Sequence, residues 1–297
     1  MPARIIQYAQ ELGFIKVGFA RPTRPLYLDA FRSWLFNRKH ADMTWLERHL
    51  EIRADPSLLL PGCRTIITLA YRYPSEKPCA PDGFTAARYS RPQQEDYHQD
   101  LKRLCRDLAA FVGGFHPGKT RICVDSAPMM ERSFAVSSAI GFIGKNNMLI
   151  IPGVGSFFYL AEILTTASLD FSPVEPIENQ CGSCEACIES CPTGALERPF
   201  LLNASKCLSY KTIEDKRPVD LEDAKRMGDC FWGCDRCQEV CPFNSGGDSR
   251  RIVLPPVHEL FEMDQEAFDK RFGKTALARG GLEKLRTNIS AVLGQSH

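Results

Sequence analysis

The stretch CGSCEACIESCPTGAL, residues 181–196, contains four cysteines within eleven residues, and Pro192 follows the last of them. The whole chain has thirteen cysteines, and nine of these lie between residues 181 and 241. Disulfide frameworks of this density belong to small secreted proteins, whereas cysteines clustered in one part of a larger chain indicate metal or redox chemistry. The spacing of the four cysteines must therefore identify the centre that they bind.

The spacing C-x2-C-x2-C-x3-C-P is that of bacterial ferredoxins, in which three thiolates hold one [4Fe–4S] cluster and the fourth reaches a second cluster. A second run, CDRCQEVCPFN at residues 234–244, supplies ligands for that second cluster. This run lacks one cysteine, and Cys207 and Cys230 are the two candidates for the missing ligand. Pairs of C-x2-C also hold zinc, but the Cys-Pro endings favour clusters.

Counting thiolates predicts two [4Fe–4S] clusters with four ligands each. One set consists of Cys181, Cys184, Cys187 and Cys241. The other consists of Cys191, Cys234 and Cys237 together with either Cys207 or Cys230. Two clusters in one domain form a path for electrons, so we expect the larger N-terminal part of the chain to hold the electrons' destination.

The composition is that of a globular protein, with 297 residues, 44% hydrophobic residues, 25% charged residues and a net charge of +1. The first residues, MPARIIQYAQELG, indicate an amphipathic helix and not a signal peptide. The most apolar stretch, residues 148–171, is interrupted by Pro152 and contains Glu162. It suits a buried hairpin better than a membrane span. We therefore expect a cytoplasmic protein.

Hydrophobic periodicity predicts a mixture of helices and strands before residue 172. The expected helices span residues 5–12, 27–38, 97–111 and 130–140, and the expected strands span residues 14–19, 65–71, 120–124 and 157–164. A Pro/Glu-rich passage, SPVEPIENQ at residues 172–180, is typical of a linker. The pattern predicts three parts: residues 1–172, a cysteine-rich domain at 173–250 and a helical segment at 251–297.

One nucleotide-binding pattern needs an explanation. Residues 113–120, GGFHPGKT, match the G-x-x-x-x-G-K-T sequence of a phosphate-binding loop. A working loop of this kind follows a strand and opens a helix, because the N–H groups at the helix start hold the phosphates. Here a helix is expected before the pattern and a strand after it, so we interpret the match as a helix-to-strand turn.

Four passages together resemble the epoxyqueuosine reductases: RADP from Arg53, EDYHQDL at 95–101, CVDSAPMMERSFAVSSAIGFIGKNNMLI at 123–150 and GCDRCQEVCPFN at 233–244. These cobalamin-dependent iron–sulfur enzymes complete the nucleoside queuosine at the wobble position of tRNA, and the resemblance covers nearly the whole chain. It implies an oxidoreductase of α+β class. The expected architecture is an α/β-type cobalamin-binding domain, a bacterial-type di-cluster ferredoxin domain and C-terminal helices. Corrinoid reductive dehalogenases are the looser relatives.

The resemblance implies that Asp125 protonates the departing epoxide oxygen while cob(I)alamin, generated through the two clusters, supplies the reducing chemistry. Asp125 follows an expected buried strand, where burial would raise the pKa of its carboxyl. From the residues alone, an N-cap of the helix expected near Met129 is the favoured role of Asp125.

The same resemblance implies pocket residues for cobalamin, namely Arg53, Tyr97, His98, Lys145 and Asn146. The passage around His98 is close to the D-x-H-x-x-G loop that supplies a cobalt ligand in other corrinoid proteins, but Leu101 stands at the glycine. We therefore expect His98 to line the pocket without binding cobalt. Among the cysteines, the resemblance selects Cys207 as the isolated cluster ligand and gives Cys230 no counterpart.

The expected partners are a tRNA anticodon loop carrying epoxyqueuosine and an external electron donor such as flavodoxin or ferredoxin. We expect a monomer that does not bind membranes. Many members carry a helical-repeat extension after the last cluster, and the end at His297 predicts a short form. Candidate basic residues at the tRNA surface are Arg250, Arg251, Lys284 and Arg286. The alternatives are a corrinoid reductive dehalogenase for small organohalides and an iron–sulfur electron-transfer module without a corrinoid.

Overall fold

The structure is a computed structural model that describes residues 2–244 and 252–294. The chain forms two compact units. The first consists of the residues up to Arg38 together with Thr44–Arg72 and His98–Ser183. The second consists of Lys39–Met43, Tyr73–Tyr97 and the chain from Cys184 onward. Residues 73–97 therefore belong with the cysteine-rich part, and the helices after residue 251 belong to the same unit.

The first unit contains the helices and strands that the periodicity predicts, with boundaries that differ by a few residues. Its helices are α1 (Pro2–Glu11), α2 (Leu28–Phe36), α3 (Leu50–Ala54), α4 (Tyr97–Gly113) and α5 (Glu131–Ser137). Its strands are β1 (Lys16–Ala20), β2 (Thr65–Arg72), β4 (Thr120–Cys123), β5 (Phe142–Ile143), β6 (Leu149–Ile150) and β7 (Phe158–Thr165).

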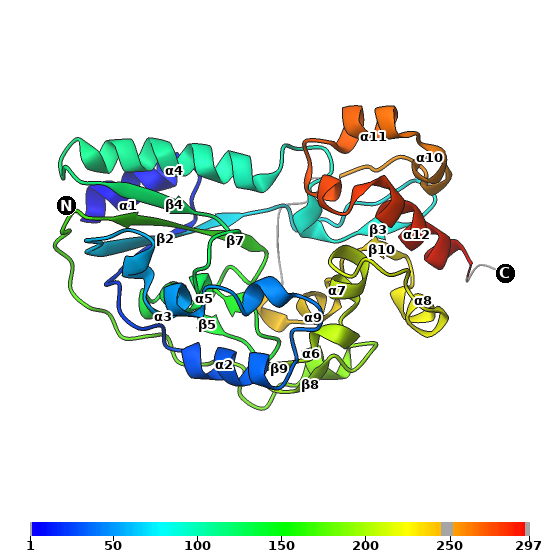
Figure 1. The fold of residues 1–297 in the computed structure, drawn as a ribbon, viewed down its shortest axis with the longest axis horizontal. Coiled ribbons are helices and arrows are strands. Elements are labelled where there is room, and N and C mark those ends of the chain that lie inside the picture. Colours follow the sequence, from blue (N-terminus) through cyan, green and yellow to red (C-terminus); the bar gives the residue numbers. More distant parts are fainter. Residues whose placement is uncertain (1, 245–251, 295–297) are drawn as a thin grey trace. The chain divides into compact units, whose positions relative to one another are not determined.

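Four strands form one sheet in the order β1-β2-β7-β4, and every neighbouring pair is antiparallel. The first six residues of β2 are buried, as its apolar sequence TIITLAYR requires. Figure 1 shows α1 and α4 on one side of this sheet and α5 on the other. The rings of Tyr8 and Phe111 stack with centroids 4.3 Å apart and join α1 to α4. A wholly antiparallel sheet with helices packed on it confirms the α+β class.

The face toward α5 is closely packed. Four consecutive residues of α5, from Ser133 to Val136, are buried. On β1, Gly18 permits the helix to come near, because a Cβ atom there would lie 2.6 Å from the Cβ of Ser138. The sheet and α5 therefore form a fixed platform for the loop between β4 and the helix.

Two local expectations meet different outcomes. The hairpin expected within residues 148–171 is wrong, because β7 pairs with β2 and β4 while the short strand β6 pairs with β5. The helix-to-strand turn at GGFHPGKT is confirmed, since α4 ends at Gly113 and β4 begins at Thr120. No helix in the described part of the chain is long and apolar enough to cross a membrane.

The second unit is built from short elements. Its helices are α6 (Ala186–Glu189), α7 (Leu208–Ile213), α8 (Leu221–Met227), α9 (Arg236–Glu239), α10 (Val257–Glu262), α11 (Gln265–Phe272) and α12 (Gly281–Leu293). Its strands are β3 (Thr85–Ala86), β8 (Leu196–Arg198), β9 (Leu201–Leu202) and β10 (Cys230–Trp232). Strands β8 and β9 pair with each other, and β10 pairs in parallel with β3.

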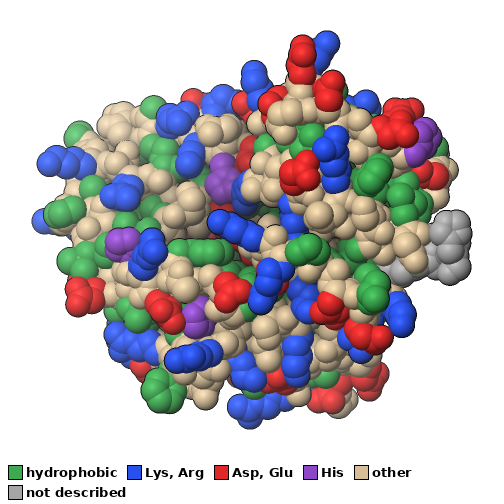
Figure 2. Space-filling view, turned by 45° about the vertical axis from the view of Figure 1, so that its right-hand side comes forward, with side chains coloured by type: hydrophobic (Ala, Val, Ile, Leu, Met, Phe, Trp, Pro, Cys, Tyr) green, Lys and Arg blue, Asp and Glu red, His purple; other side chains and the backbone are tan. Residues whose placement is uncertain are grey.

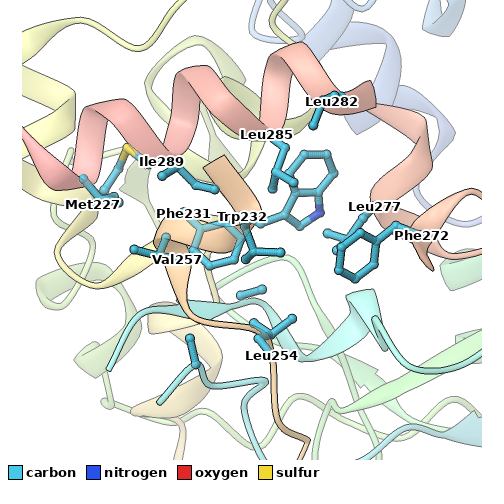
Figure 3. Close-up of a cluster of buried hydrophobic side chains, with 14 of the residues drawn as sticks. Met227, Phe231, Trp232, Leu254, Val257, Phe272, Leu277, Leu282, Leu285 and Ile289 are labelled. Atoms are coloured by element: carbon cyan, nitrogen blue, oxygen red, sulfur yellow. The ribbon is translucent and has the colours of Figure 1, made fainter. Parts of the chain in front are cut away.

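The core of the second unit forms around β10, whose Phe231 and Trp232 are fully buried. Figure 3 shows Leu282, Leu285 and Ile289 of α12 over these two rings. The indole Nε1 of Trp232 donates a hydrogen bond to the Tyr89 hydroxyl at 3.1 Å. Burying side chains of this size contributes about 1.5–3 kcal/mol each. The helices after residue 251 therefore help to hold the strand that leads into the second cysteine run.

Candidate functional site

Asp125 and His98 meet in the first unit. His98 lies in the first turn of α4, and Asp125 directly follows β4 and the buried Val124. The Nε2 atom of His98 lies 3.1 Å from Oδ2 of Asp125. Histidine exchanges protons near neutral pH, so a carboxyl in this position has a proton source beside it. The structure thus joins two residues that are 27 positions apart in sequence.

Two expectations for Asp125 are wrong. Its carboxyl is not buried, because 54% of the side chain is exposed, whereas the His98 side chain is only 12% exposed. It is also not a helix cap, since α5 begins at Glu131 behind Met130 and has no side-chain cap. Asp125 therefore carries out no capping role, and its side chain is accessible to a ligand from solvent.

A pair of acidic residues, Glu131 and Glu162, lies behind Asp125, and the sequence patterns did not identify it. The backbone N–H of Asp125 donates a hydrogen bond to Oε1 of Glu131 at 2.7 Å. Burial raises the pKa of Glu131 to about 7, with the charge of Asp125 as the next cause. Glu162 of β7 is fully buried, and burial followed by the charge of Glu131 raises its pKa as well. A lone glutamate in the apolar strand FYLAEILT was the available signal.

We expect this pair to make the protein less stable at alkaline pH. An acid whose pKa is higher in the folded than in the unfolded chain stabilises the fold at low pH and loses this contribution as pH rises through the folded pKa. For Glu131 this stability is lost over the pH range from 4.5 to about 7, and the raised pKa of Glu162 extends the range to higher pH. The apparent melting temperature should fall between pH 6 and pH 8, and Glu162→Gln should make this fall smaller.

Glu266→Gln on α11, where the side chain is exposed, is the matched control and should keep the wild-type slope. A Glu162→Gln variant with an unchanged slope would contradict this prediction. Charged or titratable groups within electrostatic reach of the pair include Arg53, Cys105, Cys123, Asp125 and Arg132.

Arg53 lies on α3 beside this group. Its Nη1 donates to the carbonyl oxygen of Met129 at 3.4 Å, and the guanidinium lies 5.6 Å from the centroid of the Phe31 ring. Burial lowers its pKa, while the charge of Glu131 acts in the opposite direction. Its Nε is buried and has no hydrogen-bond partner within residues 2–244 and 252–294. Arg53 is therefore placed on the same side of the site as the acidic pair.

The remaining predicted pocket residues lie on other elements. Lys145 and Asn146 occupy the turn between β5 and β6, where Oδ1 of Asn146 accepts a hydrogen bond from the N–H of Met148 at 3.1 Å. This bond fixes the shape of the turn. Tyr97 belongs to the second unit, and the guanidinium of Arg279 lies 5.1 Å from the centroid of its ring. The contact between His98 and Asp125 supports placing these two residues in one site.

The two cysteine runs fold alike. Helix α6 begins at Ala186, between Cys184 and Cys187, and α9 begins at Arg236, between Cys234 and Cys237. The backbone bonds repeat fifty positions apart: Cys191 N–H donates to Ile188 O at 3.2 Å, and Cys241 N–H to Gln238 O at 3.1 Å. The two helices also pack against each other. This internal repeat is the local form that the two Cys-Pro motifs predict.

Four cysteine thiols of the second unit lie within electrostatic reach of one another. Burial is the main cause of the raised pKa of Cys237, and Cys234, Cys207 and Cys191 follow in that order. Cys191 likewise acts on Cys207, and both Cys207 and Cys230 act on Cys234. These are the members of the second predicted ligand set.

Cys230 lies nearby but has a different environment. It is buried on β10, and its thiol donates weak hydrogen bonds to the carbonyl oxygens of Trp232 at 3.5 Å and Gly233 at 3.6 Å. Cys207, by contrast, is among the thiols that act on Cys237, and Cys230 is not among the causes of the raised pKa of Cys237. This contrast favours Cys207 as the fourth ligand.

Two of the basic residues expected at a tRNA surface, Lys284 and Arg286, have structural contacts instead. Lys284 is buried, and its Nζ donates to the carbonyl oxygen of Arg217 at 2.9 Å. Arg286 bonds the carbonyl oxygens of Phe261 and Met263, so its guanidinium joins α12 to α10. Arg250 and Arg251 lie outside the described residues. On the face shown in Figure 2, Lys and Arg side chains are interspersed with Asp and Glu side chains.

Known proteins match the chain in both units. Residues 53–126 match the family "Epoxyqueuosine reductase QueG, DUF1730", and residues 180–244 match the family "4Fe-4S double cluster binding domain". Epoxyqueuosine reductase from Vibrio cholerae is 35% identical over 99% of this chain and 83% of its own length.

Two solved structures of epoxyqueuosine reductases are also similar. One, with an epoxyqueuosine-modified tRNA-Tyr stem loop, has a TM-score of 0.86 and 31% identity over 98% of this chain and 80% of its own. The other, from Bacillus subtilis, has its catalytic Asp loop swung out of the active site. It has a TM-score of 0.82 and 30% identity over 98% of this chain and 80% of its own. Fold and cysteine runs together define an oxidoreductase with a double [4Fe–4S] domain. The chain belongs to the epoxyqueuosine reductase family.

Proposed function

We propose that this protein reduces epoxyqueuosine to queuosine at the wobble position of tRNA. The observation that carries the proposal is the Asp125–His98 pair, because it places an accessible acid beside an imidazole within residues 53–126, which match the epoxyqueuosine reductase family. The structure of a relative with an epoxyqueuosine-modified stem loop supports the substrate. The relative whose catalytic Asp loop is swung out of the active site supports Asp125 as the corresponding acid.

The reaction needs an acid because oxygen leaves the epoxide. Two carbon–oxygen bonds break, a carbon–carbon double bond forms, and the oxygen departs as water after taking up two protons and two electrons. A proton donor within hydrogen-bond reach of the departing oxygen lowers the barrier. Asp125 supplies a proton from its exposed carboxyl, and His98 resupplies it through the 3.1 Å contact.

Cobalamin is the cofactor that this family implies, and it supplies a strongly reducing nucleophile. The residues present fit such a group in their chemistry. Lys145 and Asn146 stand together on one turn with a fixed shape, and Arg53 has a buried Nε with no partner in the described chain. These are polar groups that suit the amide side groups of a corrin ring. His98 has its Nε2 turned to Asp125, which supports a role in the pocket without cobalt ligation.

The two clusters carry electrons from an external donor such as flavodoxin or ferredoxin. The proposed ligands of one cluster are Cys181, Cys184, Cys187 and Cys241, and those of the other are Cys191, Cys207, Cys234 and Cys237. The closeness of the second four thiols supports this division. A monomer in the cytoplasm, where tRNA is found, goes with this proposal.

The target nucleoside must leave its stack to react. Proteins that act on bases in RNA loops splay the base out and bind it in a pocket, and contacts to phosphates make the affinity dependent on salt. With a net charge of +1, the chain offers no overall attraction to RNA. We therefore expect a local group of basic side chains to provide the phosphate contacts.

The test is conversion of the substrate by the cobalamin-loaded enzyme with reduced clusters. Incubation with tRNA carrying epoxyqueuosine, followed by digestion to nucleosides, should yield queuosine, and increasing salt should weaken binding. Omitting cobalamin should abolish conversion. Lack of conversion together with dehalogenation of a small organohalide would assign the protein to the alternative enzyme class. An optical spectrum without a corrinoid band after loading would favour an electron-transfer module.

A further inference from the structure

The loop that carries Asp125 has a backbone that needs external support. Asp125 has a φ of +55°, which is unfavourable for residues other than glycine, although aspartate and asparagine tolerate it best. The chain turns tightly at Asp125 itself, where Ser126 N–H donates to Val124 O at 2.6 Å, and again just after it, where Met129 N–H donates to Ala127 O at 2.7 Å. Conformations of this kind persist when surrounding groups hold them.

Glu131 provides such support from the adjoining helix. It is the first residue of α5, and its Oε1 accepts the N–H of Asp125 itself at 2.7 Å. The next turn of α5 is anchored in the core through the buried Phe134 and Ala135. A side chain on a fixed helix therefore reaches back to the residue whose backbone is strained.

Glu131 is in turn held by Glu162. The register places Thr68, Glu162 and Cys123 side by side across the sheet. The two carboxylate oxygens of Glu162 are buried and meet no N–H or O–H donor in residues 2–244 and 252–294. Two carboxyl groups can bond only when one carries a proton. Burial raises the pKa of Glu162 and so favours its protonated form, whose O–H can donate to the carboxylate of Glu131.

We propose that Glu131, backed by Glu162, is a positioning residue that holds the Asp125 loop with its carboxyl toward His98. Glu131 accepts the Asp125 N–H at 2.7 Å, and Glu162 lies within electrostatic reach of the Glu131 carboxylate from the sheet. Its bond goes to the backbone of Asp125, so the role proposed for it is to position the loop. The inference rests on the proposed function in one respect, namely that Asp125 is the acid.

The test compares Glu131→Leu with Glu131→Gln in the enzyme containing both clusters and cobalamin. Leucine removes the acceptor, whereas the carbonyl oxygen of glutamine still accepts the Asp125 N–H. Hydrogen exchange of a peptide covering residues 124–130 reports the loop without turnover. Steady-state kinetics with the epoxyqueuosine-carrying tRNA reports the consequence for catalysis.

For Glu131→Leu we expect loop exchange to become at least about tenfold faster and kcat to fall roughly 10- to 100-fold, because a hydrogen bond to a charged group is lost. KM should change little, since no substrate contact is removed. Glu131→Gln should restore both exchange and kcat to near the wild-type values. Exchange in β2 should stay unchanged in both variants, which separates loop release from unfolding.

Wild-type exchange and kcat in Glu131→Leu would overturn the inference, and so would equal damage in Glu131→Gln. The acid assignment fails separately. An inactive Asp125→Asn beside a Glu131→Leu variant with normal exchange overturns the positioning role alone. An active Asp125→Asn overturns the acid assignment, while faster exchange in Glu131→Leu would still show that Glu131 holds the loop.

Discussion

Asp125→Asn is expected to lose turnover by on the order of 10²–10⁴-fold while both clusters and cobalamin stay bound. The variant removes the acid but keeps the loop, because asparagine tolerates the +55° φ of this position as well as aspartate does. It also removes no helix cap, since α5 has no side-chain cap. The measurement is single-turnover conversion of epoxyqueuosine in tRNA, with iron and corrinoid content determined on the same sample.

Asp107→Asn is the matched control, because Asp107 is an exposed aspartate on α4, the helix that carries His98. It should retain wild-type turnover. The turnover of His98→Asn should lie between those of Asp107→Asn and Asp125→Asn, since this variant removes the neighbour of Asp125 and leaves the acid in place. Near-normal turnover of Asp125→Asn would assign the proton to another donor.

Cys207→Ser is expected to lose one cluster, whereas Cys230→Ser should keep both. Two [4Fe–4S] clusters require about eight iron and eight sulfide per wild-type chain, and loss of one leaves about four of each. Cys207 lies within reach of Cys191 and Cys234, while the thiol of Cys230 bonds the carbonyl oxygens of its own strand. A serine hydroxyl at position 230 can donate the same hydrogen bonds.

The measurement is anaerobic iron and sulfide analysis with an electron paramagnetic resonance spectrum of the reduced protein. A normal cluster content in Cys207→Ser together with a lost cluster in Cys230→Ser would show that Cys230, and not Cys207, is the fourth ligand of the second cluster. Loss of iron in both variants would point to instability of the second unit, so the apparent melting temperature is measured on both.

The sequence by itself determined the iron–sulfur centre and most of the secondary structure. Ferredoxin runs are recognisable because each one is a local structure: within a few residues the spacing sets the backbone bonds, and these repeat between α6 and α9. Helices and strands of the first unit follow from periodicity for the same reason. The family resemblance added Asp125 and His98, but not their contact.

Only the tertiary structure decided how distant residues meet. It paired β3 with β10, so residues 73–97 joined the second unit, and it buried Lys284 where a surface charge was expected. It also brought Glu162 of β7 to Glu131, although a single glutamate in an apolar strand gives no sign of its partner. Contacts of this kind depend on the register of strands and the packing of helices, which short-range patterns in a sequence do not encode.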